Sequence, residues 1–162
     1  MYKKEIATFG AGCFWGVELG FSKLSGVLST KVGYMGGDEN KYPNPTYEQV
    51  CTDKTMYAEV LKVEFDPEKI SYNKLLDFFW ENHNPTTFNQ QGPDFGTQYI
   101  SVIFYYNDKQ RKESEFSLKE RQKKLGKERK IVTEIVKAST FYPAEEYHQK
   151  YLEKNRKESC HI

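Results

Sequence analysis

A cysteine that follows small residues and precedes two aromatic residues is the first feature of this chain that could do chemistry. Residues 10–12 read Gly-Ala-Gly, and Cys13, Phe14, Trp15 and Gly16 follow directly. Residues 5–9 read as a strand, and apolar residues at 14, 17, 21 and 24 predict a helix after the cysteine. The N-terminus of a helix offers free backbone N–H groups and a positive dipole end, which favour a thiolate. The stretch therefore indicates a reactive thiol beside an apolar wall.

Two other interpretations of this stretch stay open at this point. Cysteine is among the most buried residue types, and a buried thiol in a core helix is inert. The glycines at 10, 12 and 16 also approach the dinucleotide-binding fingerprint. Their spacing is one residue off, and no acidic residue follows in the right context, so nucleotide binding is disfavoured.

Bulk properties narrow the class of protein. The 162 residues suffice for one domain, and the net charge of +1 gives no overall field that would attract nucleic acid or an anionic membrane. The basic stretch from Lys119 to Lys130 alternates with acids and predicts a solvated helix face. No apolar run approaches a membrane span or signal peptide, so we expect a cytoplasmic protein. The three cysteines form no disulfide framework, and the scattered histidines give no metal-site pattern.

The hydrophobic pattern predicts alternating strands and helices. We expect strands over 4–9, 26–34, 58–65, 98–106 and 131–137, and helices over 13–24, 71–80, 108–124 and 144–152. Ser71 and Asp108 are the expected caps of the second and third helices. Two long polar segments, 38–56 and 82–97, lie between these elements, and loops of that length in a compact domain are usually functional.

This order favours an α+β fold in which helices pack on a mixed, ferredoxin-like sheet. In such a layout the two long loops flank the start of the first helix and so surround Cys13. We expect one catalytic domain over residues 1–155 and a mobile charged tail over 156–162 that carries Cys160.

Four polar residues stand at element ends beside the long loops. Tyr34 ends the second strand, Glu59 begins the third, Asp94 lies in a Gly-Pro-Asp-Phe-Gly turn, and Tyr99 begins the fourth. Each has a plain structural explanation as a solvated acid, a core tyrosine or a turn former. Their convergence around one thiol makes them candidates for its chemistry.

The chain resembles the methionine sulfoxide reductase A family in a series of motifs that runs from Gly12 to about Leu152. The matching segments are 12–16 (GCFWG), 33–37 (GYMGG), 44–51 (NPTYEQVC), 58–60 (AEV), 66–67 (DP), 84–87 (NPTT), 91–92 (QG), 94 and 96 (D, G), 98–99 (QY), 141–145 (FYPAE) and 147–149 (YHQ). The resemblance implies a single-domain α/β roll. It also implies reduction of the S epimer of methionine sulfoxide, free or protein-bound, with thioredoxin or another dithiol as reductant and no bound cofactor.

The resemblance also assigns roles to residues. Phe14 and Trp15 would hold the substrate's methyl group, and Tyr34 and Tyr99 would donate hydrogen bonds to the sulfoxide oxygen. Glu59, kept protonated by a desolvated site, would supply the proton. Asp94 would order the site through loop hydrogen bonds. Cys13 would attack the sulfur and become a sulfenic acid.

Cys160 would then resolve that sulfenic acid as a disulfide with Cys13, although a stray terminal cysteine is the alternative. We expect Cys51 to be packed and not catalytic, and His83 and His148 to stabilise loops. The chain departs from the family pattern at Met56-Tyr57 and at Ile100, beside proposed site residues.

Two functions from other classes compete with reduction. One is a cysteine hydrolase that uses Cys13 with His83 or His148, which would need a Cys–His hydrogen bond. The other is a non-catalytic peptide-binding module built on the aromatic pocket. For the reductase and for both alternatives, we expect a monomer that binds neither nucleic acid nor membrane.

Overall fold

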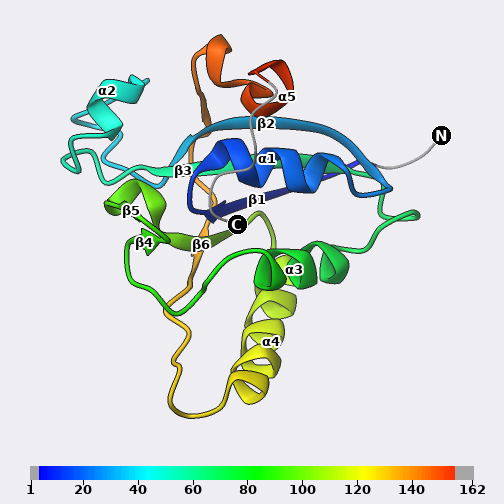
Figure 1. Ribbon diagram of the computed structural model, residues 1–162. Helices are drawn as coiled ribbons and strands as arrows, with labels where there is room; N and C mark the ends of the chain where they lie inside the picture. Colours follow the sequence, from blue (N-terminus) through cyan, green and yellow to red (C-terminus); the bar gives the residue numbers. More distant parts are fainter. Residues whose placement is uncertain (1–3, 156–162) are drawn as a thin grey trace.

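A six-stranded mixed sheet forms the centre of the computed structural model, which describes residues 4–155 (Figure 1). Its strands lie in the order β7-β6-β1-β3-β2-β8. Their bounds are β1 (Glu5–Ala11), β2 (Val27–Met35), β3 (Ala58–Phe65), β6 (Ser101–Tyr105), β7 (Glu134–Lys137) and β8 (Tyr142–Pro143). The β3 bounds match the strand predicted from sequence, those of β1, β2, β6 and β7 differ by a few residues, and β8 was not predicted.

The four central strands have the split pairing of the ferredoxin-like plan. β3 pairs antiparallel with both β1 and β2, and β6 pairs antiparallel with the other side of β1. β7 adds a parallel strand beside β6, and β8 adds a short antiparallel strand beside β2. The predicted mixed sheet with flanking helices is confirmed.

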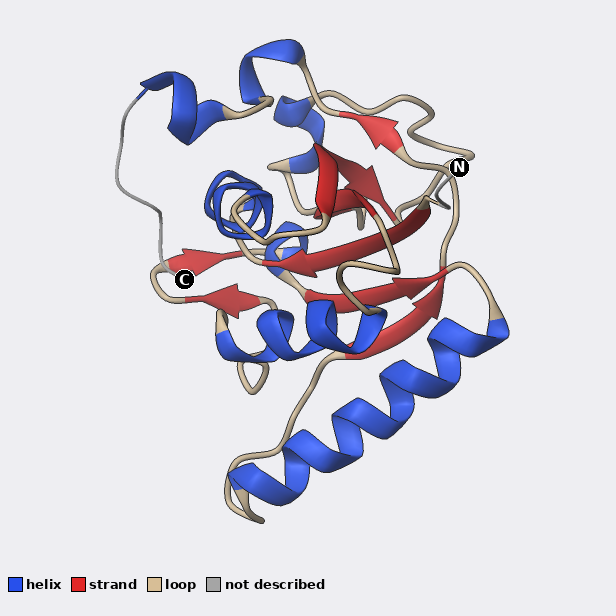
Figure 2. Ribbon diagram, turned by 90° about the vertical axis from the view of Figure 1, so that its right-hand side faces the viewer, coloured by secondary structure: helices blue, strands red, loops and turns tan. Residues whose placement is uncertain are grey.

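Three helices cover one face of this sheet (Figure 2). They are α1 (Phe14–Ser22), α3 (Tyr72–Glu81) and α4 (Asp108–Leu125). The main core lies between them and the sheet, where the ring of Phe9 from β1 meets those of Phe21 and Phe79 at centroid distances of 5.3 Å. A smaller apolar cluster around Met35 and Phe104 covers part of the opposite face.

The two long loops contain short ordered elements. α2 (Tyr47–Val50) lies in the first loop. The second holds a small hairpin, β4 (Gln90–Gln91) with β5 (Asp94–Phe95), and the 3-10 turn η1 (Thr97–Tyr99). The strand predicted from residue 98 begins only at Ser101, because η1 follows Gly96, whose φ of 137° turns the chain.

The predicted helix over 144–152 is wrong, because the chain forms a 3-10 turn, η2 (Glu146–His148), and then α5 (Tyr151–Asn155). The break lies at Gln149, whose side chain accepts from the N–H of Val32 and donates to its carbonyl. Lys150 follows with a φ of 54°. The expected cap of α4 also moves by one residue, because the side chain of Asn107, not Asp108, accepts from Gln110 N–H.

The strand directions bring the candidate residues to one edge of the sheet. Because β3 and β6 run antiparallel to β1, the end of β1 meets the starts of β3 and β6. The end of β2 lies at the same edge, where Tyr34 pairs directly with Glu59. Figure 1 shows α2 and the β4–β5 hairpin near the start of α1 at this edge.

The predicted tail, 156–162 with Cys160, lies outside the described residues. Within residues 4–155, no helix combines the length and apolarity needed to cross a bilayer.

Candidate active site

Cys13 occupies a tight corner between β1 and α1. It is the N-cap residue of α1, its side chain makes no capping hydrogen bond, and it is half-buried. The preceding Gly12 has a φ of 95°, and a Cβ at this position would lie 2.7 Å from the Cγ of Gln91. The corner therefore requires glycine for both its conformation and its close approach, and it directs Cys13 to the helix N-terminus.

Gln91, from the second long loop, packs against Gly12 in the turn between β1 and α1. Its side chain is buried, accepts a hydrogen bond from the N–H of Asn84 at 2.9 Å and donates to the carbonyl of the same residue. The amide is thus fixed by the loop on one side while its methylene groups face Gly12. The loop over 82–97 therefore supports the position of Cys13, as expected of a functional loop.

Glu59 lies beside the start of α1, next to Cys13. Its side chain is 1% exposed, and its Oε1 accepts a hydrogen bond from the main-chain N–H of Phe14 at 3.2 Å. That N–H belongs to the first turn of α1, one residue after Cys13. The structure therefore brings together the two residues to which the family resemblance assigned the roles of nucleophile and acid.

Tyr99 lies close to the same pair. It is half-buried, and its pKa is raised, first by burial and then by the charges of Glu59, Asp94 and Cys13. Its hydroxyl therefore keeps its proton at neutral pH and can donate a hydrogen bond. Asp94 belongs to β5 and acts on Tyr99 through its charge.

Tyr34 lies beside Phe14 and has a hydrogen-bond partner of its own. It is fully buried, and its hydroxyl donates to Oε1 of Glu145 at 2.9 Å. Burial, followed by the hydrogen bond and charge of Glu145, raises its pKa. Its proton is thus already directed at a carboxylate. The role predicted for Tyr34 competes with this bond, which the sequence could not reveal because Glu145 lies 111 residues away.

Tyr47 is a site residue that the sequence interpretation missed. It opens α2, is half-buried, and its ring stacks on that of Phe14 at a centroid distance of 6.5 Å. Burial and then the charge of Glu59 raise its pKa, so its hydroxyl keeps its proton, and this hydroxyl also makes a hydrogen bond with the side chain of Cys51. The loop has no periodicity to mark it, although Tyr47 lies within the matching motif 44–51.

The aromatic wall divides into a buried and an accessible part. Phe14 is 1% exposed and packs among Tyr34, Tyr47 and His148. Trp15 is half-exposed and stacks on Tyr151 at 3.8 Å between ring centroids. Its indole N–H donates to Nδ1 of His148 at 3.0 Å, which fixes the orientation of the ring.

Neither histidine forms the Cys–His pair that a hydrolase would need. In His148, Nδ1 is engaged by Trp15 and Nε2 has no hydrogen-bond partner among residues 4–155. In His83, Nδ1 lies against the carbonyl of Phe79 and Nε2 lies 2.7 Å from Oγ of Ser101. Both histidines make hydrogen bonds that join different segments of the chain, in line with the expectation that they stabilise loops.

Cys51 is exposed, so the expectation that it is packed is wrong. It lies at the C-cap of α2, beyond the buried Val50, and its sulfur accepts a hydrogen bond from Gln98 at 3.4 Å. Partial burial of the sulfur still raises the pKa of the thiol. Cys51 therefore favours the less nucleophilic, protonated form.

The departures from the family pattern have separate structural consequences. Met56 is 59% exposed, whereas Tyr57 is fully buried and donates its hydroxyl proton to the carbonyl of Tyr42 at 2.8 Å. Tyr57 thereby ties the ends of the first long loop together. Ile100 packs against the smaller apolar cluster.

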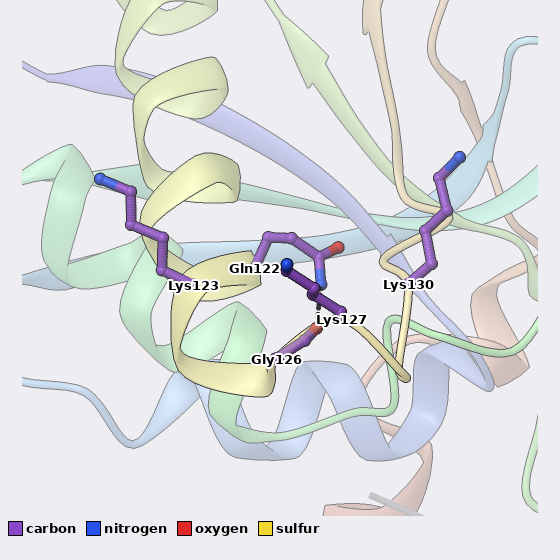
Figure 3. Close-up of a pocket in the computed structure, with 5 residues that line it drawn as sticks. All are labelled: Gln122, Lys123, Gly126, Lys127 and Lys130. Carbon is purple, nitrogen blue, oxygen red and sulfur yellow. Dashed lines mark hydrogen bonds between the residues drawn. The ribbon is translucent and has the colours of Figure 1, made fainter.

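A hollow of about 660 Å³ lies far from this site, at the end of α4. Gln122, Gly126 and three lysines line it, and Figure 3 shows Lys123 and Lys130 pointing away from each other. Lysines that diverge into solvent do not converge on a ligand. The surface fits the solvated helix face predicted from its alternating charges.

Comparison with known proteins identifies the class to which this fold and site belong. A model of the family described as peptide methionine sulfoxide reductase matches residues 5–162. The chain belongs to this family. It is an enzyme that reduces methionine sulfoxide in a thiol-dependent reaction, and the resemblance seen in the sequence motifs is confirmed.

Individual relatives agree over nearly the whole chain. The peptide methionine sulfoxide reductase MsrA of Methanothermobacter thermautotrophicus is 57% identical over 98% of this chain and 92% of its own. That of Pelagibacter ubique is 54% identical over 93% of this chain and 99% of its own. The crystal structure of reduced Mxr1 from Saccharomyces cerevisiae matches with a TM-score of 0.92 and 42% identity, over 98% of this chain and 90% of Mxr1.

Proposed function

We propose that Cys13 attacks the sulfur of methionine S-sulfoxide while Glu59 supplies a proton to the sulfoxide oxygen. The oxygen passes to Cys13, which becomes a sulfenic acid, and methionine leaves with its sulfur reduced. Tyr99 and Tyr47 donate hydrogen bonds to the oxygen as its charge develops. Donors fixed in a desolvated site stabilise such charge more strongly than water does.

The hydrogen bond from Phe14 N–H to Glu59 supports this proposal most strongly. The bond holds the Glu59 carboxyl group at Phe14, the residue that follows Cys13, on the buried side of the turn between β1 and α1. The aromatic residues support the other half of the substrate. Trp15 offers an accessible apolar ring for the methyl group, and Phe14 supports it from the core.

For the second half of the cycle, we propose that Cys160 condenses with the sulfenic acid, releases water and leaves a Cys13–Cys160 disulfide. A thioredoxin dithiol then reduces this disulfide. A related structure supports the partner: Mxr1 from Saccharomyces cerevisiae in complex with Trx2 matches with a TM-score of 0.63 and 29% identity, over 93% of this chain and 88% of that one.

We also propose a cellular setting for the enzyme. Thioredoxin-dependent turnover fits a reducing cytoplasm, where the enzyme would reverse methionine oxidation under oxidative stress in free and protein-bound methionine. The site residues come from one chain, which is compatible with a monomer. No bound cofactor is needed, because thiols supply both electrons.

Single-turnover experiments test the proposal. Wild-type protein mixed with methionine S-sulfoxide and no reductant should release about one methionine per chain, and Cys13→Ser should release none. Cys160→Ser should still release one methionine but fail to turn over with thioredoxin. Normal turnover by Cys13→Ser would refute the nucleophile, and undiminished thioredoxin turnover by Cys160→Ser would assign resolution to another thiol.

A further inference from the structure

The carboxylate of Glu145 joins two tyrosines of the site that lie on different elements. Its Oε1 accepts the hydroxyl proton of Tyr34 from β2, and its Oε2 accepts the main-chain N–H of Tyr47 at the start of α2, each at 2.9 Å. Each oxygen thus has a donor, and the residue lies 98 positions from Tyr47 in the chain. The contact ties the loop that carries Tyr47 to the sheet.

Glu145 is held in its charged form by these bonds. Burial alone would raise its pKa, but hydrogen bonds from Tyr47 N–H, from its own backbone N–H and from the Tyr34 hydroxyl outweigh burial and lower it. Charged acceptors form stronger hydrogen bonds than neutral ones. The hydrogen bond from Tyr47 N–H to the charged carboxylate of Glu145 is therefore present at neutral pH.

The main chain at Tyr47 needs this hydrogen bond because α2, the helix that it begins, is short. α2 has four residues, and its capping box of Thr46 and Gln49 is internal to the loop. The side chain of Tyr47 lies on aromatic faces, at centroid distances of 6.5 Å from Phe14 and 4.4 Å from His148. Ring contacts of this kind leave the main chain free to shift, whereas the Glu145 bond fixes it at Tyr47 itself.

We propose that Glu145 is a positioning residue that sets the Tyr47 hydroxyl for donation to the sulfoxide oxygen. This inference rests on the proposed function, in which Tyr47 is a donor. Glu145 touches no substrate and acts through Tyr47. Small displacements of a donor cost rate, and such losses fall on the chemical step when ground-state binding is unchanged.

The test measures the rate of methionine release in a single turnover, at a series of methionine S-sulfoxide concentrations. Glu145→Gln preserves side-chain volume but replaces the charged acceptor. We expect the maximal rate to fall about 10-fold and the half-saturating concentration to change by less than about 2-fold. Glu146→Gln, which removes a charge from the exposed neighbouring residue, should match wild type.

A double-mutant cycle with Tyr47→Phe separates positioning from a general structural role. If Glu145 acts through the Tyr47 hydroxyl, Glu145→Gln should change the rate by less than about 2-fold once that hydroxyl is absent. An equal loss in both backgrounds, or no loss in wild type, would overturn the inference. If Glu145→Gln unfolds, Glu145→Asp, which keeps the charge, is measured in the same cycle under the same criterion. Failure of the proposed function would be seen separately, as methionine release by Cys13→Ser.

Discussion

The main-chain N–H of Phe14 donates to Oε1 of Glu59 at 3.2 Å, which joins the first turn of α1 to the start of β3. The bond couples the position of the Glu59 carboxyl group to that of Cys13, which precedes Phe14. A shift in either element would separate them. The candidate site thus lies at a junction between a helix and a strand whose bonded residues are 45 positions apart in sequence.

Replacing Glu59 by glutamine should slow methionine release strongly. The amide preserves an acceptor for Phe14 N–H but cannot give up a proton, and general acid catalysis is typically worth 10² to 10⁴-fold, so we expect a loss of at least about 100-fold. Rapid-quench measurement of methionine in a single turnover gives this rate. Glu64→Gln, on the same strand with its partner Lys4 at 3.5 Å, is the matched control and should react normally. An unchanged rate for Glu59→Gln would remove it from the acid role.

Gly12→Ala should impair catalysis beyond its effect on stability. Gly12 and Gly126 both have positive φ, at 95° and 85°, so alanine at either costs roughly 1–2 kcal/mol in backbone strain. Only at Gly12 would the new Cβ meet Gln91, whereas at Gly126 nothing lies within 4 Å among residues 4–155. By denaturant unfolding, Gly12→Ala should lose at least as much stability as Gly126→Ala. Only Gly12→Ala should also reduce the alkylation of Cys13 and the turnover rate. Equal activity in both variants would contradict the claim that the close approach of Gly12 to Gln91 positions Cys13.

Trp15→Phe should weaken substrate binding. Phenylalanine keeps an apolar ring but loses the indole N–H that donates to His148, so the ring is no longer held for the methyl group. We expect the KM for methionine sulfoxide to rise several-fold while alkylation of Cys13 by a small reagent is unchanged. Trp80→Phe loses a comparable bond, to Ser117 at 2.7 Å, far from the site. Steady-state kinetics on both variants checks this, and an equal KM change would show that Trp15 has no special role.

His83 should make the fold sensitive to mild acid. Burial lowers its pKa from 6.5 to about 4, despite the hydrogen bond with Phe79 that acts in the opposite direction. The unfolded chain therefore binds a proton between these values and the folded chain does not, so stability is complete above about pH 6.5 and falls toward pH 4.

The shift corresponds at most to roughly 3 kcal/mol, and the remaining exposure of the ring reduces this. Urea unfolding at pH 7 and pH 5 measures the loss. The His83→Gln variant should lose less stability over this interval than wild type, even if it starts lower. An identical pH dependence in both proteins would place the acid sensitivity elsewhere.

The sequence could predict those parts of the fold that periodicity and local chemistry determine. The alternation in residues 58–65 marked β3, and Ser71 capped α3 as expected through its bond to Lys74 N–H. Residues at element ends, Glu59 and Tyr99, were also correctly associated with Cys13, because the split sheet brings those ends together.

Other features depend on contacts between distant residues and could not be predicted. The hydroxyl of Tyr34 donates a hydrogen bond to Glu145 on a distant segment, and Tyr47 lies in a loop without a periodic pattern. The helix expected over 144–152 broke because Gln149 bonds the backbone of Val32. For Tyr34 and for Gln149, a contact with a residue 111 or 117 positions away along the chain decided the local structure.

Trapping of the oxidised thiol tests the central claim most directly. The Cys160→Ser variant is mixed with one equivalent of methionine S-sulfoxide and dimedone, which labels sulfenic acids, and is then digested for mass spectrometry. The account predicts one dimedone adduct, on Cys13, in an amount equal to the methionine released. An adduct on Cys51, or release of methionine with Cys13 still a free thiol, would contradict it.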